Sequence, residues 1–115
     1  MQVTPSGQGL GARVEGFDLS QPLTHENYKK IEGLLGQFGV LCFKKQNLTG
    51  QQLKEFSSKF GTLEVNVANM YQEPGHPEVM ILSNKKVDGK PIGLGDAGQD
   101  WHTDMSYSKM IAFTN

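Results

Sequence analysis

His102 and Asp104 are the residues with the clearest chemical potential, and one residue separates them. On a β-strand, residues i and i+2 project from the same face, so an imidazole and a carboxylate at this spacing lie side by side. Together they can occupy two adjacent positions around one metal ion. A distant histidine would complete the two-histidine, one-carboxylate set that binds non-heme Fe(II). On spacing alone, a surface histidine hydrogen-bonded to an aspartate is the more frequent case.

Two neighbouring patterns do not predict a site. Residues 93–98 match G-x-G-x-x-G, but a dinucleotide site needs a strand before this motif and a helix after it. Here Pro91 comes shortly before the motif and no helical pattern follows. Asp96, Asp100 and Asp104 are four residues apart, but the glycines disfavour a helix and the spacing differs from that of a calcium loop. We therefore predict an exposed loop here, with Asp96 and Asp100 in solvent.

The elements that must position these residues begin with two helices. The first is predicted after Pro22, with Thr24 as its N-cap and Gly39 as its end. Its apolar residues recur at helical spacing and are Tyr28, Ile31, Leu34, Leu35 and Phe38. The second begins with a capping box, in which Thr49 and Gln52 satisfy each other's free amides. Its apolar stripe is Leu53, Phe56 and Phe60, and Gly61 is predicted to end it.

The strands are predicted from shorter patterns. Residues 10–17 suit a short strand or edge hairpin, residues 40–43 a short buried strand, and residues 78–83 a further strand. Turns are predicted at 74–77 and 87–90, whereas residues 63–71 are ambiguous and extended at most. The resulting order β-α-β-α-β-β is typical of an α+β fold.

Composition limits the class of protein. The chain has 115 residues and a formal net charge of -1, which fits one globular domain without a basic surface for nucleic acid. It has no apolar stretch of membrane-spanning length and no signal peptide at its N-terminus. Cys42 is its single cysteine, so no internal disulfide can form. We therefore expect a cytoplasmic protein.

Four blocks of sequence favour the interpretation of His102 and Asp104 as metal ligands. In chain order they are FDLSQPLT (17–24), GVLCFKKQNLT (39–49), FSSKFGTL (56–63), and GKPIGL (89–94) leading into WHTDMSY (101–107). Together they resemble the taurine dioxygenase (TauD/TfdA-type) family of Fe(II)/2-oxoglutarate-dependent dioxygenases. The resemblance covers nearly the whole chain, and its last block looks like the iron motif of that family.

The resemblance implies a fold and two metal ligands. The family fold is a double-stranded β-helix, or jelly roll, with an N-terminal α/β portion. His102 and Asp104 would be iron ligands, a distal histidine near the C-terminus would be the third, and a C-terminal arginine would bind the 2-oxoglutarate carboxylate. On this pattern, residues 1–115 are a single, incomplete domain that contains the α/β portion and the first jelly-roll strands. The chain is expected to be the N-terminal portion of a longer enzyme.

The function implied is the oxidation of a small organic acid or sulfonate, with decarboxylation of 2-oxoglutarate to succinate. Substrate-contacting side chains of taurine-specific members correspond here to Asn66, Asn69 and Gly98, which makes taurine doubtful. Asn66, Asn69 and Tyr107 are the substrate-side candidates, with ordinary structural roles as the alternative. Trp101 is expected to be a core residue beside the barrel.

The same resemblance predicts that this chain alone is inactive. His25 and His76 are expected to be exposed and unengaged, and Arg13, the single arginine, lies near the N-terminus. The third ligand and the 2-oxoglutarate anchor are then missing, and Fe(II) should bind weakly or not at all. Exposed strand edges left by truncation predict a homodimer or larger assembly.

Two alternatives remain open at this point. One is a non-catalytic oligomerising or interaction module left by truncation. The other is a plain metal-binding protein that assembles a site from two His102/Asp104 pairs across a symmetry axis.

Overall fold

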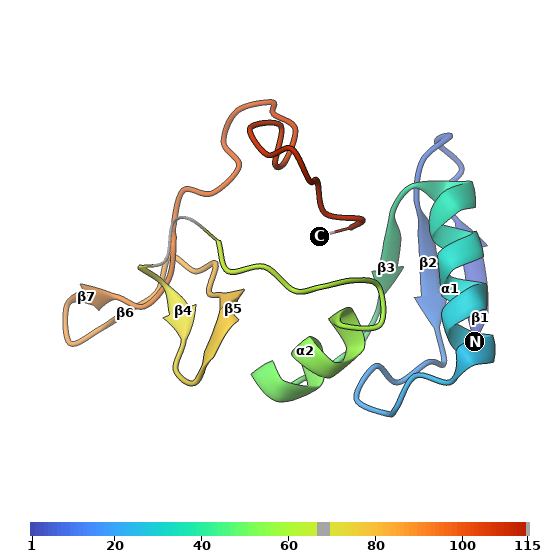
Figure 1. The fold of residues 1–115 in the computed structure, drawn as a ribbon, viewed down its shortest axis with the longest axis horizontal. Coiled ribbons are helices and arrows are strands. Elements are labelled where there is room, and N and C mark those ends of the chain that lie inside the picture. Colours follow the sequence, from blue (N-terminus) through green and yellow to red (C-terminus); the bar gives the residue numbers. More distant parts are fainter. Residues whose placement is uncertain (67–69, 115) are drawn as a thin grey trace. The chain divides into compact units, whose positions relative to one another are not determined.

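The computed structural model describes residues 1–66 and 70–114 (Figure 1). The chain divides into an N-terminal unit, Met1–Lys59, and a C-terminal unit, Phe60–Asn115. The N-terminal unit contains β1 (Gln2–Pro5), β2 (Ala12–Glu15), α1 (His25–Phe38), β3 (Leu41–Phe43) and α2 (Gly50–Ser57). The C-terminal unit contains β4 (Gln72–Glu73), β5 (His76–Met80), β6 (Lys86–Val87) and β7 (Lys90–Pro91). This mixture of helices and strands confirms the predicted mixed class.

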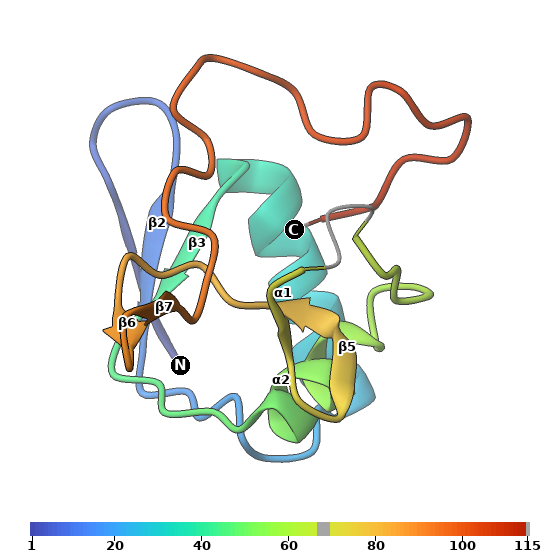
Figure 2. The same cartoon turned by 90° about the vertical axis from the view of Figure 1, so that its left-hand side faces the viewer.

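A three-stranded sheet with the order β1-β2-β3 forms the centre of the N-terminal unit. β1 and β2 pair antiparallel, with Val3 opposite Val14, and β2 and β3 pair parallel, with Arg13 opposite Cys42. Parallel neighbours need a crossover connection, and α1 lies in that connection, along one face of the sheet (Figures 1 and 2). The buried core consists of Ala12, Val14, Leu19 and Ile31.

Two strand predictions for this unit need correction. The predicted strand or hairpin over 10–17 is present as β2, but its partner is β1, which the sequence patterns did not indicate. The strand predicted over 40–43 is present as β3, yet it is not buried, because Cys42 is exposed. As the last strand in the sheet order, β3 has one edge without a described partner strand.

Local capping explains the bounds of α1. The Thr24 Oγ1 atom accepts a hydrogen bond of 3.2 Å from the Asn27 amide, which satisfies one of the free amides of the first turn. Gly39 follows the helix with φ 72°, and its amide donates to the Leu35 carbonyl at 2.7 Å. A residue without Cβ adopts this left-handed conformation at low cost. The structure confirms the predicted helix at both ends.

The capping box of α2 is also confirmed, but the end of the helix is not. The Gln52 amide donates to Thr49 Oγ1 at 3.2 Å, and the Thr49 amide donates to Gln52 Oε1 at 2.9 Å. The helix ends at Ser57, before Phe60 and Gly61. Ser58 caps it with its hydroxyl, which donates to the Glu55 carbonyl at 2.9 Å.

Two hairpins form the regular part of the C-terminal unit. The predicted turn at Pro74 and Gly75 joins β4 to β5, and Glu73 pairs with His76. Because pairing begins directly after this turn, β5 starts two residues before the predicted strand and ends at Met80. The predicted 87–90 turn joins β6 to β7. Asp88 and Gly89 have φ values of 49° and 76°, as a two-residue hairpin turn with positive φ at both centres requires.

The remaining segments have no regular secondary structure in the described residues. Within the stretch of ambiguous prediction, residues 63–66 and 70–71 form no strand, and residues 67–69 lie outside the described range. Neither helix that the structure describes has the length and hydropathy needed to cross a membrane.

Candidate metal centre

A short parallel contact anchors the loop that leads to His102. Leu82 and Leu94 form an isolated bridge, in which the Leu94 amide donates to the Ile81 carbonyl at 2.9 Å and the Ser83 amide donates to the Leu94 carbonyl at 3.1 Å. Gly93 makes this approach possible, because a Cβ there would lie 2.8 Å from the Ile81 carbonyl oxygen. The backbone before the loop is therefore fixed against the segment that follows β5.

The loop itself is exposed, as predicted. Asp96 and Asp100 lie on the surface, and none of residues 93–100 is helical. Gly98 adopts φ +72°, and a Cβ at this position would lie 3.5 Å from the Cε1 atom of His102. The loop interpretation of the G-x-G-x-x-G segment is confirmed.

The structure brings His102 and Asp104 together. The Nε2 atom of His102 lies 3.2 Å from Oδ1 of Asp104, and 54% and 56% of the two side chains are exposed. The Nδ1 atom of His102 lies 2.7 Å from the main-chain carbonyl oxygen of Asp100. Both ring nitrogens thus have an oxygen partner, and the ring edge that carries Nε2 faces the carboxylate.

The expected strand at this motif is not present. Residues 101–103 have no regular structure and 104–107 form a turn, in which Met105 adopts φ 56°. A strand needs a neighbour to satisfy its main-chain groups, and no ladder among the described residues includes this segment. The turn and the Asp100 contact, instead of strand alternation, place the imidazole beside the carboxylate.

The described residues do not supply a third ligand. They contain no group of three histidine, cysteine, aspartate or glutamate side chains that could hold one metal ion. His25 is exposed at the start of α1, as expected. The same expectation was wrong for His76, which is half-buried on β5 because the hairpin begins there. Its Nδ1 atom is buried without a hydrogen-bond partner in the described part of the chain.

The other predicted residues are on the surface. Asn66 is exposed in the irregular 62–66 stretch, and Tyr107 is 72% exposed in the turn after Asp104. Asn69 lies outside the described residues. Trp101 was expected in a core, but its exposed fraction is 104%, because no described segment covers this stretch. Substrate contact by Asn66, Asn69 and Tyr107 stays a prediction.

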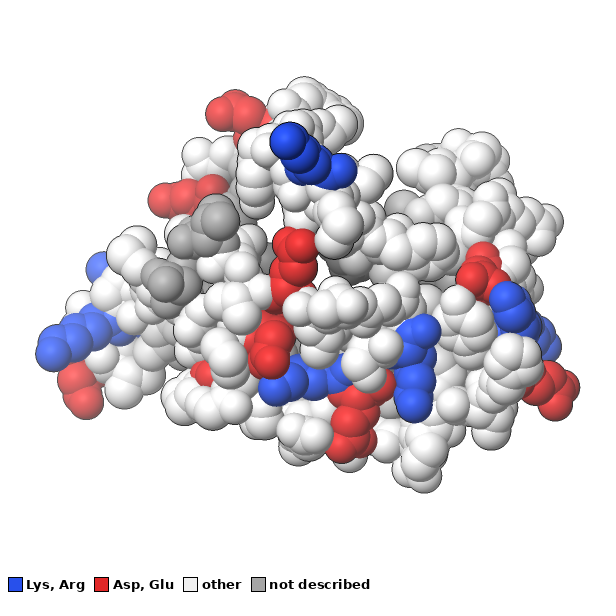
Figure 3. All heavy atoms as spheres, in the orientation of Figure 1, with Lys and Arg blue, Asp and Glu red and all other residues white. Residues whose placement is uncertain are grey.

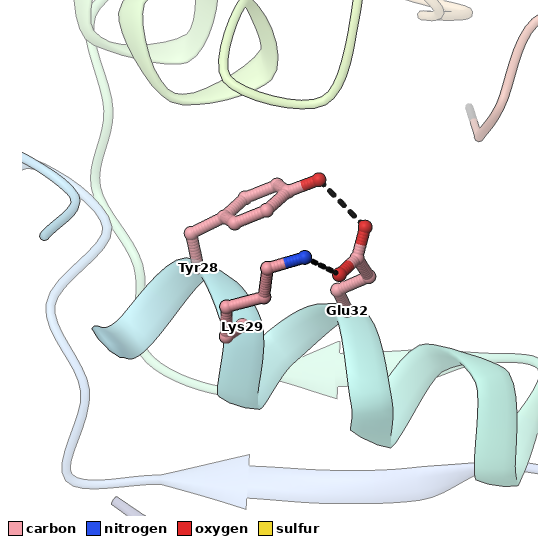
Figure 4. Close-up of polar contacts among 3 residues, drawn as sticks. All are labelled: Tyr28, Lys29 and Glu32. Carbon is pink, nitrogen blue, oxygen red and sulfur yellow. Dashed lines mark hydrogen bonds and ion pairs between the residues drawn. The ribbon is translucent and has the colours of Figure 1, made fainter. Parts of the chain in front are cut away.

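A second polar cluster, which the sequence patterns did not indicate, lies on α1 (Figure 4). Tyr28 Oη donates to Glu32 Oε1 at 2.6 Å, and Lys29 Nζ lies 2.9 Å from Glu32 Oε2. The hydrogen bond from Lys29, followed by that from Tyr28, lowers the pKa of Glu32. The hydrogen bond to Glu32 also raises the pKa of both Lys29 and Tyr28. These shifts hold all three groups in their ordinary charge states, which suits stabilisation of the helix better than proton transfer.

Charged side chains of both signs are interspersed over the face shown in Figure 3. This distribution agrees with the net charge of -1. Asp18, in the segment between β2 and α1, has a lowered pKa because the Ser20 side chain and then the Ser20 amide hydrogen-bond to its carboxylate. Such a bond caps the local turn.

Several relatives of the chain are named alpha-ketoglutarate-dependent dioxygenases, and one is named a synthase. It is 30% identical to pentalenolactone F synthase of Streptomyces arenae over 115 residues, which cover 97% of this chain and 38% of that protein. It is 32% identical to the alpha-ketoglutarate-dependent 2,4-dichlorophenoxyacetate dioxygenase of Cupriavidus pinatubonensis, over 90% of this chain and 39% of that protein. The chain therefore spans less than two fifths of the length of these relatives.

Solved structures show the same relationship. A taurine dioxygenase from Burkholderia xenovorans superposes with a TM-score of 0.61 at 32% identity, over 66% of this chain and 27% of that one. AAD-2 in complex with Mn(II) and N-oxalylglycine superposes with a TM-score of 0.53 at 28% identity, over 56% of this chain and 23% of that one.

The family comparison covers almost every residue. Residues 2–113 match the family described as taurine catabolism dioxygenase TauD, TfdA family, and this range includes all four sequence blocks and the His102/Asp104 pair. The chain belongs to the taurine catabolism dioxygenase TauD, TfdA family.

Proposed function

We propose that this chain carries two metal ligands of an Fe(II)/2-oxoglutarate-dependent dioxygenase, which oxidises a small organic acid or sulfonate and decarboxylates 2-oxoglutarate to succinate. The observation that carries the proposal is the 3.2 Å contact between His102 Nε2 and Asp104 Oδ1, within a chain that the family match covers over residues 2–113. Relatives named for 2,4-dichlorophenoxyacetate and phenoxypropionate support an organic acid as substrate.

The donor set of the pair suits such a metal. An imidazole nitrogen and a carboxylate oxygen are the ligand types of the facial triad that leaves positions open on Fe(II). When bound, the metal supplies the redox chemistry that couples 2-oxoglutarate decarboxylation to substrate oxidation. His102 and Asp104 would hold it, and their half-exposed side chains leave room for further ligands. Asn66, Asn69 and Tyr107 are proposed to contact substrate.

We infer that the third ligand and the arginine that binds 2-oxoglutarate come from sequence outside these 115 residues. The match covers only 38% and 39% of the length of two curated relatives, which supports this inference. Residues 1–115 would then be one incomplete domain that contains the first strands of a jelly roll. We propose a cytoplasmic location from the single exposed thiol, Cys42.

Titration with Mn(II) tests the half-site directly. We expect weak binding of one ion per chain, measured by the loss of the free Mn(II) electron paramagnetic resonance signal. His102→Ala and Asp104→Ala should each weaken it by about tenfold or more, since changes even in residues that only support a ligand cost this much. His25→Ala, at the exposed start of α1, is the matched control and should bind like the wild type. Equal binding by all four proteins would refute the proposed ligands.

Turnover tests the expectation that the chain alone is inactive. Chain supplied with Fe(II), 2-oxoglutarate and dioxygen should form no succinate above the level of the His102→Ala variant. Succinate formation by the wild-type chain and not by the variant would show that two protein ligands suffice.

An interaction module is the second candidate, and exposed apolar side chains favour it. Trp101, Met110, Ile111 and Phe113 are all exposed in the last part of the C-terminal unit. Apolar groups gathered in one segment commonly mark a contact surface. Light scattering, which measures self-association, tests the oligomerising form of this candidate.

A further inference from the structure

The ring of His102 is held at more than one position. Its Nδ1 atom lies 2.7 Å from the Asp100 carbonyl oxygen, and its Nε2 atom lies 3.2 Å from Asp104 Oδ1. Its Cε1 atom lies beside Gly98, close enough that a Cβ there would be in van der Waals contact at 3.5 Å. These contacts come from residues within six positions of one another, so the loop itself sets the ring orientation.

The contact with Asp100 also selects a tautomer. The Asp100 carbonyl and the Asp104 carboxylate can both only accept a hydrogen bond, and a neutral imidazole has one N–H to donate. The contact with Asp100 is the shorter of the two, at 2.7 Å against 3.2 Å, and therefore favours Nδ1 as the donor. In a neutral imidazole one nitrogen is a donor and the other an acceptor. The hydrogen on Nδ1 therefore leaves the Nε2 lone pair free, on the ring edge that faces Asp104.

Two acceptor atoms then face each other across 3.2 Å. In the neutral ring, the Nε2 lone pair and the Asp104 carboxylate repel unless a cation lies between or beside them. The hydrogen bond to Asp100 thus prepares an arrangement that a divalent cation would stabilise. Metal-binding histidines are commonly oriented in this way, by a hydrogen bond from the nitrogen that does not bind the metal.

We propose that the main-chain carbonyl of Asp100 is a positioning group, which fixes His102 as the Nδ1–H tautomer and presents Nε2 as the metal-binding atom. This inference rests on the proposed metal-binding function. The contact uses the main chain of Asp100, so the residue type at this position gives no sign of it in the sequence.

Nitrogen NMR of the metal-free chain tests the tautomer. Long-range 1H–15N correlation would be recorded at a pH high enough that the ring resonances no longer change with pH, so that the ring is neutral. His102 should show a protonated Nδ1 and an unprotonated Nε2. His25, an exposed histidine whose ring lies 6.3 Å from that of Tyr28, is the internal control and should show the Nε2–H form that free histidine favours. Predominance of the Nε2–H form at His102 would overturn the proposal.

A methylated histidine tests the consequence for metal binding. Nδ1-methylhistidine at position 102 keeps the Nε2 lone pair but cannot donate to the Asp100 carbonyl. We expect its affinity for Mn(II) to fall by about tenfold or more, the usual cost of removing such a support, whereas the same methylated residue at position 25, an exposed histidine that is not a proposed ligand, should bind like the wild type. Circular dichroism would verify that each protein folds. Wild-type affinity in the methylated protein would overturn the positioning role.

The two readouts separate this inference from the proposed function. Failure of the wild-type chain to bind Mn(II), together with the Nδ1–H tautomer at His102, would refute metal binding by these 115 residues alone and support the positioning contact. Mn(II) binding together with the Nε2–H tautomer would support the metal site and refute the positioning contact.

Discussion

Gln46 joins two segments of the N-terminal unit through one half-buried side chain. Its Oε1 atom accepts the Leu19 amide at 2.9 Å, and its Nε2 atom donates to the Phe17 carbonyl at 2.8 Å and the Lys44 carbonyl at 2.9 Å. The two segments belong to separate blocks of the family resemblance. Gln46→Ala should lower the free energy of unfolding by about 1–3 kcal/mol, because it leaves main-chain groups without partners.

The control for this change is another glutamine. Gln51 donates to Glu55 at 2.8 Å on the exposed surface of α2, so Gln51→Ala should change the free energy of unfolding by no more than about 0.5 kcal/mol. Urea unfolding followed by circular dichroism measures both. Equal effects of the two variants would mean that Gln46 does not hold the segments together.

Glu32 gives the N-terminal unit a predictable response to acid. Lys29 and Tyr28 lower its pKa below the ordinary value of 4.5 (Figure 4). A carboxyl whose pKa is lowered by folding stabilises the protein above its unfolded pKa, and that contribution is lost as the pH falls through the folded pKa. The wild type should therefore be more stable than Glu32→Gln at neutral pH, and the difference should shrink as the pH falls below 4.5.

Two further measurements separate this effect from general acid unfolding. Lys29→Met removes the largest cause of the shift, so the carbon NMR titration of Glu32 should move back toward its ordinary pKa. Added salt should narrow the stability difference at neutral pH, because none of the three side chains is buried. A difference independent of both pH and salt would rule out the electrostatic explanation.

At the scale of single residues, sequence spacing predicted some of the contacts in the structure and missed others. The proximity of His102 and Asp104 could be predicted because the motif is local. The Asp100 contact could not, because a main-chain carbonyl is the same in every residue type. His76 was misplaced, since its burial depends on where the β4–β5 hairpin begins.

Among the elements, α2 is the short helix whose stability we expect to depend on its N-terminal cap. It has eight residues, and its N-terminus carries the reciprocal Thr49 and Gln52 hydrogen bonds. Isolated helices of this length are marginal in water. Thr49→Ala should lower the free energy of unfolding by about 1 kcal/mol, with a loss of helical circular dichroism that exceeds the loss caused by Gln51→Ala.

A conservative variant makes the capping interpretation testable. Thr49→Ser keeps a hydroxyl that can accept the Gln52 amide, so it should retain most of the wild-type stability. If Thr49→Ser were as destabilising as Thr49→Ala, the threonine methyl group rather than the cap would be the cause.

Helices could be predicted more accurately than strands, and the reason is the range of the interactions involved. The caps at Thr24, Gly39 and Thr49 depend on residues three or four positions away, so a sequence pattern contains them. β1 escaped prediction because its stability comes from pairing with β2, several residues further along the chain. The early end of α2 depends on the Ser58 hydroxyl, which competes with continuation of the helix.

For the whole molecule, the buried apolar side chains and the motif with the proposed ligands lie in different units. The buried apolar residues Ala12, Val14, Leu19 and Ile31 all belong to the N-terminal unit, among the residues that the structure describes. The motif with the proposed ligands belongs to the C-terminal unit. The four sequence blocks identified the family because each is a short motif that can be read locally in the sequence. The expected jelly-roll strands stay a prediction, because a jelly roll depends on strand pairings between distant segments, which no local pattern contains.

The exposed apolar side chains of the C-terminal unit lead to a prediction about assembly. Trp101, Ile111 and Phe113 are exposed, and the two-stranded sheets β4-β5 and β6-β7 have edges without described partners. Burying such groups against a second copy would remove apolar surface from water and pair strand edges. Light scattering at micromolar concentration should therefore give at least twice the monomer mass of 12.7 kDa.

Replacing Ile111 and Phe113 by Ser should shift the population toward monomer, whereas Val40→Ser, at an exposed apolar position of the N-terminal unit, should not. A monomeric wild-type chain would contradict both the predicted homodimer and the oligomerising form of the module alternative.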